Sequence, residues 1–215
     1  MKKQSAAIRK MVVSAMLGAI TAVLTFTPIG MIPLPPPLLS VTTVHIPVIV
    51  AAIIEGPGVG LLVGLVFGLC SFIRAWETGM VGLTLFFRNP LVSVLPRLIV
   101  PLAAFGAYWL WKRFVPRNKA LDKVGGALAA ALGAVTNTVV VLGMIVLLYE
   151  PQLTTIVNEM ISAGSAEAVY LDHAGAWLVA AVGLPNGIAE AIVAALVVPV
   201  IQTAVDAVLH RSRSK

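Results

Sequence analysis

Long apolar blocks make up most of the chain, and short polar or basic segments separate them. A bilayer core of about 30 Å needs roughly 20 helical residues per span. On that scale the blocks predict six transmembrane helices, at about 8–27, 44–55, 59–76, 83–111, 125–149 and 174–209. The fold class we expect is therefore an all-α membrane protein, with residues 1–215 forming a single domain.

Three prolines interrupt the fourth block, at positions Pro90, Pro96 and Pro101. Proline lacks the N–H that an interior helical residue donates, so it kinks or breaks a helix. Irregular backbone at membrane depth is tolerated where protein or water surrounds it. We therefore expect the first part of this block to be re-entrant or broken.

Composition excludes an ordinary soluble domain. Of the 215 residues, 59% are hydrophobic and 11% are charged, against about 25% charged in soluble proteins. The net charge of +6 is compatible with nucleic-acid binding, but basic and aromatic residues do not interleave on any polar face. We expect membrane lipid, and no nucleic acid, around this chain.

The basic residues instead indicate an orientation. Six spans place both termini and the segment between spans four and five on one side, and positive charge marks the cytoplasmic side. Twelve of the fifteen basic residues lie there: Lys2, Lys3, Arg9, Lys10, Lys112, Arg113, Arg117, Lys119, Lys123, Arg211, Arg213 and Lys215. This predicts cytoplasmic termini in the inner or plasma membrane of a prokaryote.

Two connections on the opposite side are unusual. Residues 28–43 are apolar and proline-rich, including Pro33, Pro35 and Leu38, and residues 150–173 are acidic and amphiphilic. An apolar loop at an aqueous surface suggests that it packs over something, so the two segments are candidates for a lid over an outer cavity. Alternatively, the first loop dips into the headgroup region.

Polar side chains inside predicted spans are costly and require a partner, a cavity or a site. The candidates are Arg97, His45, Asn137, Asn186 and Glu190. The last two lie one helical turn apart and share a face. Purely structural roles are the alternative: Arg97 pairs with Glu190 as a lock, the asparagines join helices, and His45 is a satisfied interfacial histidine.

Known catalytic motifs are missing from the sequence. It contains no Gly-x-Ser-x-Gly, no His-Glu-x-x-His and no paired-carboxylate metal motif. Cys70 is the single cysteine, which excludes a disulfide within the chain. A Walker A loop is also missing, so we expect no ATP hydrolysis by this chain itself. From the missing motifs together we expect that the protein is not an enzyme and has no catalytic residue, no metal and no cofactor.

Small residues form two strips at helical spacing. Ala15, Gly18, Ala19 and Ala22 share one face of the first predicted span, where a partner helix could approach closely. Packing within the chain would give the same pattern. A second strip, Gly56, Gly60, Gly64 and Gly68, is more typical of an internal packing seam.

These residues together resemble a known family, the substrate-binding S components of energy-coupling factor (ECF) vitamin transporters. The resemblance rests on the six predicted spans, the Ala15-x-x-x-Ala19 strip, the stretch His45-Ile46-Pro47 with Glu55-Gly56-Pro57, and the glycine-rich third span. It extends through Gly133–Thr138 and Asn186–Glu190.

The resemblance implies a vitamin pocket near the outer face, built from spans four to six and capped by the loop between spans one and two. Pro33, Pro35 and Leu38 would then belong to the gate loop. It also implies a coupling membrane subunit, contacted by Ala15 and Ala19, and two cytoplasmic ATPases that drive release.

Gly30-Met31-Ile32-Pro33 and Thr42-Thr43-Val44-His45 look most like the pantothenate-type branch. On that basis the expected substrate-binding residues are Arg97, Asn137, Asn186, Glu190, His45 and Thr43. Arginine suits the carboxylate of pantothenate and asparagine its amide and hydroxyls. Riboflavin, folate and cobalamin remain alternatives, as do a stand-alone ion-gradient transporter and a membrane scaffold.

Overall fold

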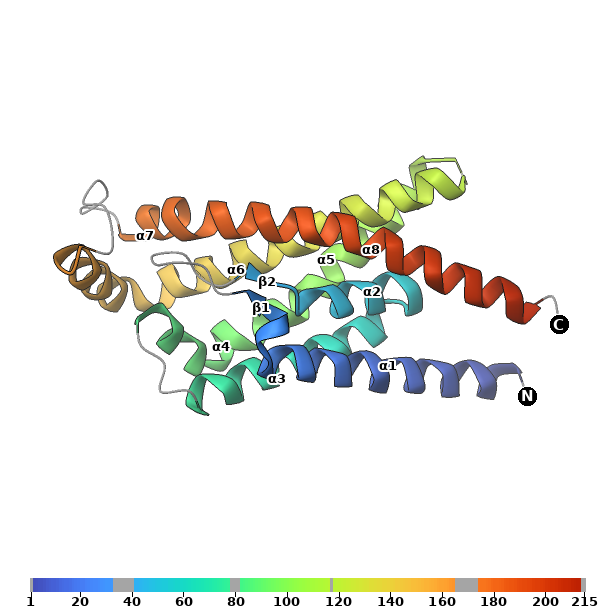
Figure 1. Ribbon diagram of the computed structural model, residues 1–215, viewed down its shortest axis with the longest axis horizontal. Helices are drawn as coiled ribbons and strands as arrows, with labels where there is room; N and C mark the ends of the chain where they lie inside the picture. The colour runs from blue at the N-terminus through green and yellow to red at the C-terminus, as the bar shows by residue number, and fades with distance from the viewer. Residues whose placement is uncertain (1, 33–40, 78–81, 117, 165–173, 214–215) are drawn as a thin grey trace.

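The computed structural model describes residues 2–32, 41–77, 82–116, 118–164 and 174–213, and helices running along one long axis dominate these ranges (Figure 1). The longer helices are α1 (Lys2–Phe26), α2 (His45–Glu55), α3 (Pro57–Glu77), α5 (Leu95–Phe114), α6 (Lys119–Ser162) and α8 (Leu184–Arg213). The shorter ones are η1 (Pro28–Gly30), η2 (Gly82–Arg88), α4 (Pro90–Ser93), α7 (Ala174–Trp177) and the π-helical η4 (Leu178–Gly183). Strands β1 (Met31–Ile32) and β2 (Val41–Thr42) form a two-residue antiparallel ladder.

Five segments of the described chain are long and apolar enough to cross a membrane. They are Ala7–Phe26, Pro57–Trp76, Pro90–Phe114, Lys119–Ser162 and Ala174–Val205. Both termini and the connection between α5 and α6 lie at the same end of the bundle (Figure 1), which is the arrangement that an even number of spans produces. The chain is a multi-pass, all-α membrane protein, while the count of six spans and the cytoplasmic termini stay predictions.

Helix α2, at the place of the second expected span, is short and central. It has 11 residues, of which nine are buried, so neighbouring helices rather than lipid surround most of it. It ends at Gly56, whose φ of 98° favours glycine and whose N–H donates to the carbonyl of Ala52. An added Cβ on Gly56 would meet nothing within 4 Å, so this glycine makes the turn into α3 and does not belong to a packing seam.

The remaining glycines of that strip let α3 approach α5. A Cβ on Gly64 would lie 2.3 Å from the carbonyl oxygen of Arg97, one on Gly60 would lie 2.8 Å from Pro101, and one on Gly68 would lie 2.8 Å from Val94, the residue before α5. Pro101 stands four residues after Arg97 and has no N–H to donate to that carbonyl. Helix α3 therefore packs where the hydrogen-bond ladder of α5 is open, which confirms the internal seam at these three glycines.

The proline-rich fourth block is divided into η2, α4 and α5. Asn89 caps α4, because its side-chain oxygen accepts the Leu91 N–H at 2.9 Å while its amide donates to the Tyr149 hydroxyl at 2.9 Å. Tyr149 sits at a kink in α6, with φ −136° and ψ 23°, two residues before Pro151, and its ring lies 4.8 Å from that of Phe86. The short elements thus pack on the bend of α6, which continues as helix to Ser162 inside the expected 150–173 connection.

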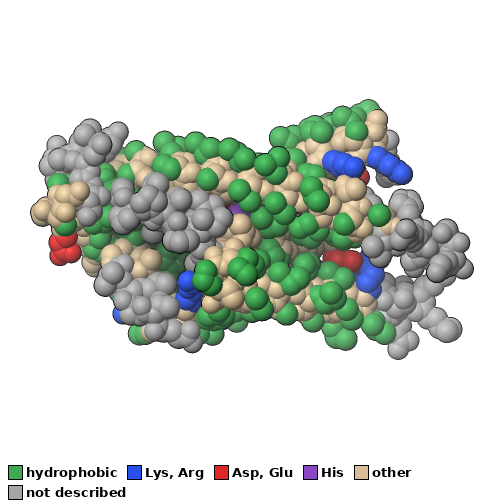
Figure 2. Space-filling view, in the orientation of Figure 1, with side chains coloured by type: hydrophobic (Ala, Val, Ile, Leu, Met, Phe, Trp, Pro, Cys, Tyr) green, Lys and Arg blue, Asp and Glu red, His purple; other side chains and the backbone are tan. Residues whose placement is uncertain are grey.

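The surface agrees with a lipid environment. Figure 2 shows hydrophobic side chains along the length of the bundle, with blue basic side chains at the end that holds both termini and others nearer its middle. Near that end Arg9 Nη2 lies 3.0 Å from Glu55 Oε2 and joins α1 to α2. The Glu55 side chain is only 4% exposed, so this ion pair gives a partner to a buried carboxylate that would otherwise be an unpaired charge.

Candidate functional site

A cavity of about 210 Å³ lies inside the bundle, and residues of α3, α5, α6, η4 and α8 line it. Four of the substrate-binding residues predicted from sequence line this cavity together: Arg97, Asn137, Asn186 and Glu190. They come from three helices that are far apart in the sequence. We call this space the inner cavity.

Arg97 is held rigidly but keeps unused hydrogen-bond capacity. Its guanidinium carbon lies 5.0 Å from the ring centre of Phe67 and 5.1 Å from that of Phe87, and Nη1 donates to the Val92 carbonyl at 3.0 Å. The residue is 6% exposed and its Nε has no hydrogen-bond partner. Between the described residues Arg97 and Glu190 there is no direct ion pair. A buried cation with no carboxylate at ion-pair distance among the described residues suits an anionic ligand.

Three more polar groups at the inner cavity lack partners. The side-chain oxygens of Asn137, Asn186 and Ser71 are buried and make no hydrogen bond within the described structure. Leaving such a group unpaired costs about 1–3 kcal/mol. Together with Arg97 Nε, they provide acceptors and donors for a ligand with hydroxyl and amide groups.

An irregular stretch of helix positions Asn186. Helix α7 leads into the π-helical turn η4, and α8 follows with Pro185 as its second residue. Proline cannot donate to the preceding turn, so a local change of helical pitch accommodates it there. Val182 and Gly183 of η4 line the inner cavity beside Asn186. Such π-turns are frequent at functional sites.

Glu190 joins the inner cavity to the base of the expected gate loop. Its Oε1 accepts from both the backbone N–H and the hydroxyl of Thr42, each at 2.8 Å, and Oε2 accepts from the Thr138 hydroxyl at 3.5 Å. Thr42 is the last residue of β2, opposite Met31 in the ladder. The carboxylate is 4% exposed and fixes the end of the loop to α8.

The remaining predicted residues lie elsewhere. Thr43 donates its backbone N–H to the Gly30 carbonyl at 3.0 Å and is not among the residues lining the inner cavity, where its neighbour Thr42 lies instead. His45 is completely buried with neither ring nitrogen bonded in the described structure, and it too lies outside the lining. The gate-loop residues Pro33, Pro35 and Leu38 fall outside the described residues.

Several lining residues were not among the predicted binding residues. Ser71, Thr84 and Thr138 contribute hydroxyls, and Phe87 of η2 contributes an aromatic ring. In membrane helices, serine and threonine side chains commonly hydrogen-bond to the backbone of their own helix. Their presence in the sequence therefore did not indicate a binding site. Arg74 also lines the inner cavity, and its Nη1 donates to the carbonyl of Thr25 on α1.

The charge of the described lining favours a monoanion. Arg74, Arg97 and Glu190 are its charged members, which leaves one net positive charge. No group of three or more His, Cys, Asp or Glu residues in the described part of the chain is placed to hold a metal ion. This lining can accommodate a small polar anion.

Helix α1 presents its small residues in two directions. Gly18 is buried, and a Cβ there would lie 3.7 Å from Val66 of α3. Ala15 and Ala19 are instead exposed, on a face that also carries the exposed Met16 and Ile20. The strip is therefore divided between internal packing and an open face.

Comparisons with known proteins agree with this architecture. Residues 9–202 match a family described as ECF transporter, substrate-specific component. A stretch of 105 residues, 46% of this chain, is 35% identical to "Pantothenate transporter PanT" of Leuconostoc mesenteroides subsp. mesenteroides and spans 51% of that protein. A stretch of 137 residues, 57% of this chain, is 30% identical to "Pantothenic acid transporter PanT" of Lactococcus lactis subsp. cremoris and spans 64% of it.

Both alignments cover less than two thirds of the relative's own length. The family match, in contrast, includes all or part of each described helix, from residue 9 in α1 to residue 202 in α8. The chain therefore belongs to the substrate-specific components of ECF transporters.

Proposed function

We propose that this protein captures pantothenate with high affinity in the inner cavity, as the substrate-binding subunit of an ECF importer in a prokaryotic plasma membrane. Two similar proteins bear the name of pantothenate transporters. The residues of the inner cavity give an independent, chemical reason for the same substrate.

Pantothenate carries one carboxylate, one amide and two hydroxyls. Arg97 supplies charge-assisted donors for the carboxylate. The free oxygens of Asn137 and Asn186 accept from hydroxyl and amide hydrogens, and Ser71 can do either. Burial makes each of these bonds selective, because a ligand lacking the matching group leaves a polar atom unpaired.

A single observation carries the proposal: Arg97 is buried in the inner cavity, between two phenylalanine rings, without a carboxylate partner among the described residues. An arginine that served only as a structural lock would be paired with Glu190. Instead Thr42 and Thr138 donate to Glu190, and Arg97 Nε keeps a free donor for a ligand.

The gate in this proposal is residues 28–43. The β1–β2 ladder closes the base of that loop, and Glu190 binds its last strand. A ligand entering beside Arg97 and Asn186 would meet the same α8 turn that holds Thr42. In this proposal, the loop of residues 28–43 closes over the bound vitamin.

Energy would come from other subunits: a coupling membrane subunit and two cytoplasmic ATPases. This chain has no Walker A loop. The exposed Ala15 and Ala19 on α1 are the surface that we assign to the coupling subunit, because small residues allow close helix approach.

The proposal is tested by purifying the protein in detergent from vitamin-replete cells, denaturing it, and identifying co-purified small molecules by mass spectrometry. We expect near-stoichiometric pantothenate. A flavin, folate or cobalamin would keep the transport role and overturn the substrate. An empty protein whose melting temperature no vitamin shifts would favour a gradient-driven transporter or a membrane scaffold.

A further inference from the structure

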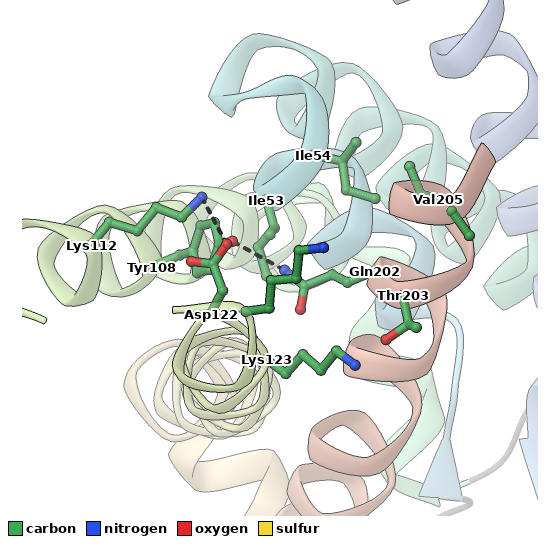
Figure 3. A pocket seen from close by; sticks show the side chains of 11 residues that line it. Ile53, Ile54, Tyr108, Lys112, Asp122, Lys123, Gln202, Thr203 and Val205 are labelled. Carbon is green, nitrogen blue, oxygen red and sulfur yellow. Dashed lines mark hydrogen bonds and ion pairs between the residues drawn. The ribbon is translucent and has the colours of Figure 1, made fainter. Parts of the chain in front are cut away.

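A second cavity, of about 390 Å³, lies at the end of the bundle that holds both termini and the α5–α6 connection. We call it the end cavity. Figure 3 shows Tyr108 and Lys112 of α5, Asp122 and Lys123 of α6, and Gln202 and Thr203 of α8 around it. It shares no lining residue with the inner cavity, so the captured substrate does not account for it.

The end cavity is basic. Lys112 Nζ lies 3.5 Å from Asp122 Oδ2 and 4.4 Å from the ring centre of Tyr108. Lys119 and Lys123 also line the cavity, and among the side chains that the structure describes neither has a carboxylate within ion-pair distance. Three lysines against one aspartate attract an anion, and the ammonium groups of Lys119 and Lys123 are available to bind it.

A buried amide forms part of the wall. Gln202 is 8% exposed, and its Nε2 donates to the Tyr108 hydroxyl at 3.3 Å. Its Oε1 has no partner in the described structure. A Cβ on Gly126 would lie 1.9 Å from that oxygen, so a glycine at this position is what leaves room for the amide. The free oxygen can accept a hydrogen bond from a ligand hydroxyl, which a simple inorganic anion held by lysines does not supply.

The other side of the end cavity is apolar. Ile53, Ile54 and Val205 line it, and the exposed Val124 of α6 and Val200 of α8 lie one helical turn or less from its lining residues. A free inorganic anion gains nothing from such surface, whereas an amphiphile does. Basic pockets between transmembrane helices on the cytoplasmic side are suited to lipid headgroups.

We propose that the end cavity binds an anionic phospholipid with a hydroxylated headgroup. Lys119 and Lys123 contact the phosphodiester, the headgroup hydroxyl donates to Gln202 Oε1, and the acyl chains run along the exposed apolar faces of α6 and α8. The lipid joins the ends of α5, α6 and α8, so bound lipid stabilises the folded protein by mass action.

The test uses the full chain in detergent, with dioleoyl phosphatidylglycerol, dioleoyl phosphatidylcholine and inorganic phosphate as separate probes. Native mass spectrometry and thermal unfolding are the readouts. We expect phosphatidylglycerol to remain bound and raise the melting temperature by several degrees, and the other two to do neither. An equal shift with inorganic phosphate would overturn the lipid assignment in favour of a free-anion site.

Matched variants separate the end cavity from general surface charge. Lys119→Gln with Lys123→Gln should abolish the phosphatidylglycerol effect, whereas Lys10→Gln with Arg113→Gln removes the same charge from exposed residues outside the lining and should preserve it. Equal loss in both pairs would overturn the proposal. Equal phosphatidylglycerol binding by wild type and by the Lys119→Gln, Lys123→Gln double variant would also overturn the proposal. That result is expected if the end cavity instead receives an acidic protein segment.

The amide gives a second, independent arm. Phosphatidylmethanol has the same phosphodiester charge but no headgroup hydroxyl. Wild type should prefer phosphatidylglycerol over it, and Gln202→Leu should lose that preference while still binding both lipids and unfolding cooperatively. A preference unchanged in Gln202→Leu would contradict the assigned contact.

Discussion

The inner cavity and the end cavity both carry excess positive charge, but they hold it in different ways. Arg97 is 6% exposed and fixed between two aromatic rings, whereas the Lys112 side chain at the end cavity is 49% exposed. A planar guanidinium in a dry site recognises one carboxylate geometry, and flexible, hydrated ammonium groups attract phosphate without fixing it. Excess positive charge therefore gives selective capture in one place and adaptable lipid contact in the other.

The surroundings of the neutral polar groups extend the comparison. At the inner cavity, Asn137, Asn186 and Ser71 each leave an oxygen unpaired, while at the end cavity only Gln202 does so among the described lining residues. More unpaired groups mean more points at which a wrong ligand is rejected. The inner cavity is consequently the place where we expect substrate selection.

The largest expected effect separates selection from transport. If the inner cavity alone selects substrate, bulky residues on the open face of α1 should not change binding. Ala15→Trp with Ala19→Trp should abolish pantothenate uptake in cells, because two indoles prevent close helix approach, yet leave the dissociation constant of the purified protein unchanged.

A matched control for the α1 variants is Leu132→Trp, at an exposed position on α6. It should retain uptake. Weakened binding in the Ala15/Ala19 variant, or full uptake by it, would break the assigned division of roles.

A smaller effect tests recognition by fixed geometry. Asn137→Ala removes one buried acceptor from the inner cavity, and a hydrogen bond contributes about 0.5–1.5 kcal/mol, or roughly 2- to 10-fold in affinity. Isothermal titration calorimetry with pantothenate measures this loss. Asn158→Ala, at an exposed position on the same helix, should change nothing, and equal affinities for all three proteins would remove Asn137 from the site.

The smallest effect concerns the attachment of the gate. Thr42→Val keeps the backbone N–H bond to Glu190 and removes the hydroxyl bond at 2.8 Å. We expect pantothenate to dissociate about two- to fivefold faster, less than the about 1.5–3 kcal/mol of a full hydrogen bond to a charged group, because the backbone N–H of Thr42 still holds Glu190. Stopped-flow displacement measures the rate.

Thr27→Val is the control for the gate variant, because the Thr27 hydroxyl donates to the Val23 carbonyl in the last turn of α1 and does not contact Glu190. Its dissociation rate should match wild type. An unchanged rate in Thr42→Val would show that the ladder, and not the Glu190 contact, holds the loop.

Much of this architecture could be predicted from hydrophobic patterning. The apolar blocks predicted the long helices, and the cost of polar groups in a membrane singled out Arg97, Asn137, Asn186 and Glu190, which line one cavity. The cause is physical: a polar group at these positions stands out against an apolar background, so even one sequence reveals it.

Other features gave no such signal. The lining residue is Thr42 and not Thr43, a distinction that depends on the register of a two-residue ladder. His45 stands out as strongly as Arg97 in the sequence but lies outside the inner cavity. The π-helical turn before Pro185 depends on how neighbouring helices accommodate a proline, and the continuation of α6 beyond Tyr149 depends on packing at its kink.

The most direct test of the central claim measures binding of pantothenate and of its neutral alcohol analogue, pantothenol, to wild type and Arg97→Met. Wild type should prefer pantothenate, and Arg97→Met should weaken pantothenate binding about 10- to 100-fold, the value of one charged hydrogen bond, while binding pantothenol as wild type does. A preference for the carboxylate that survives in Arg97→Met would contradict the account.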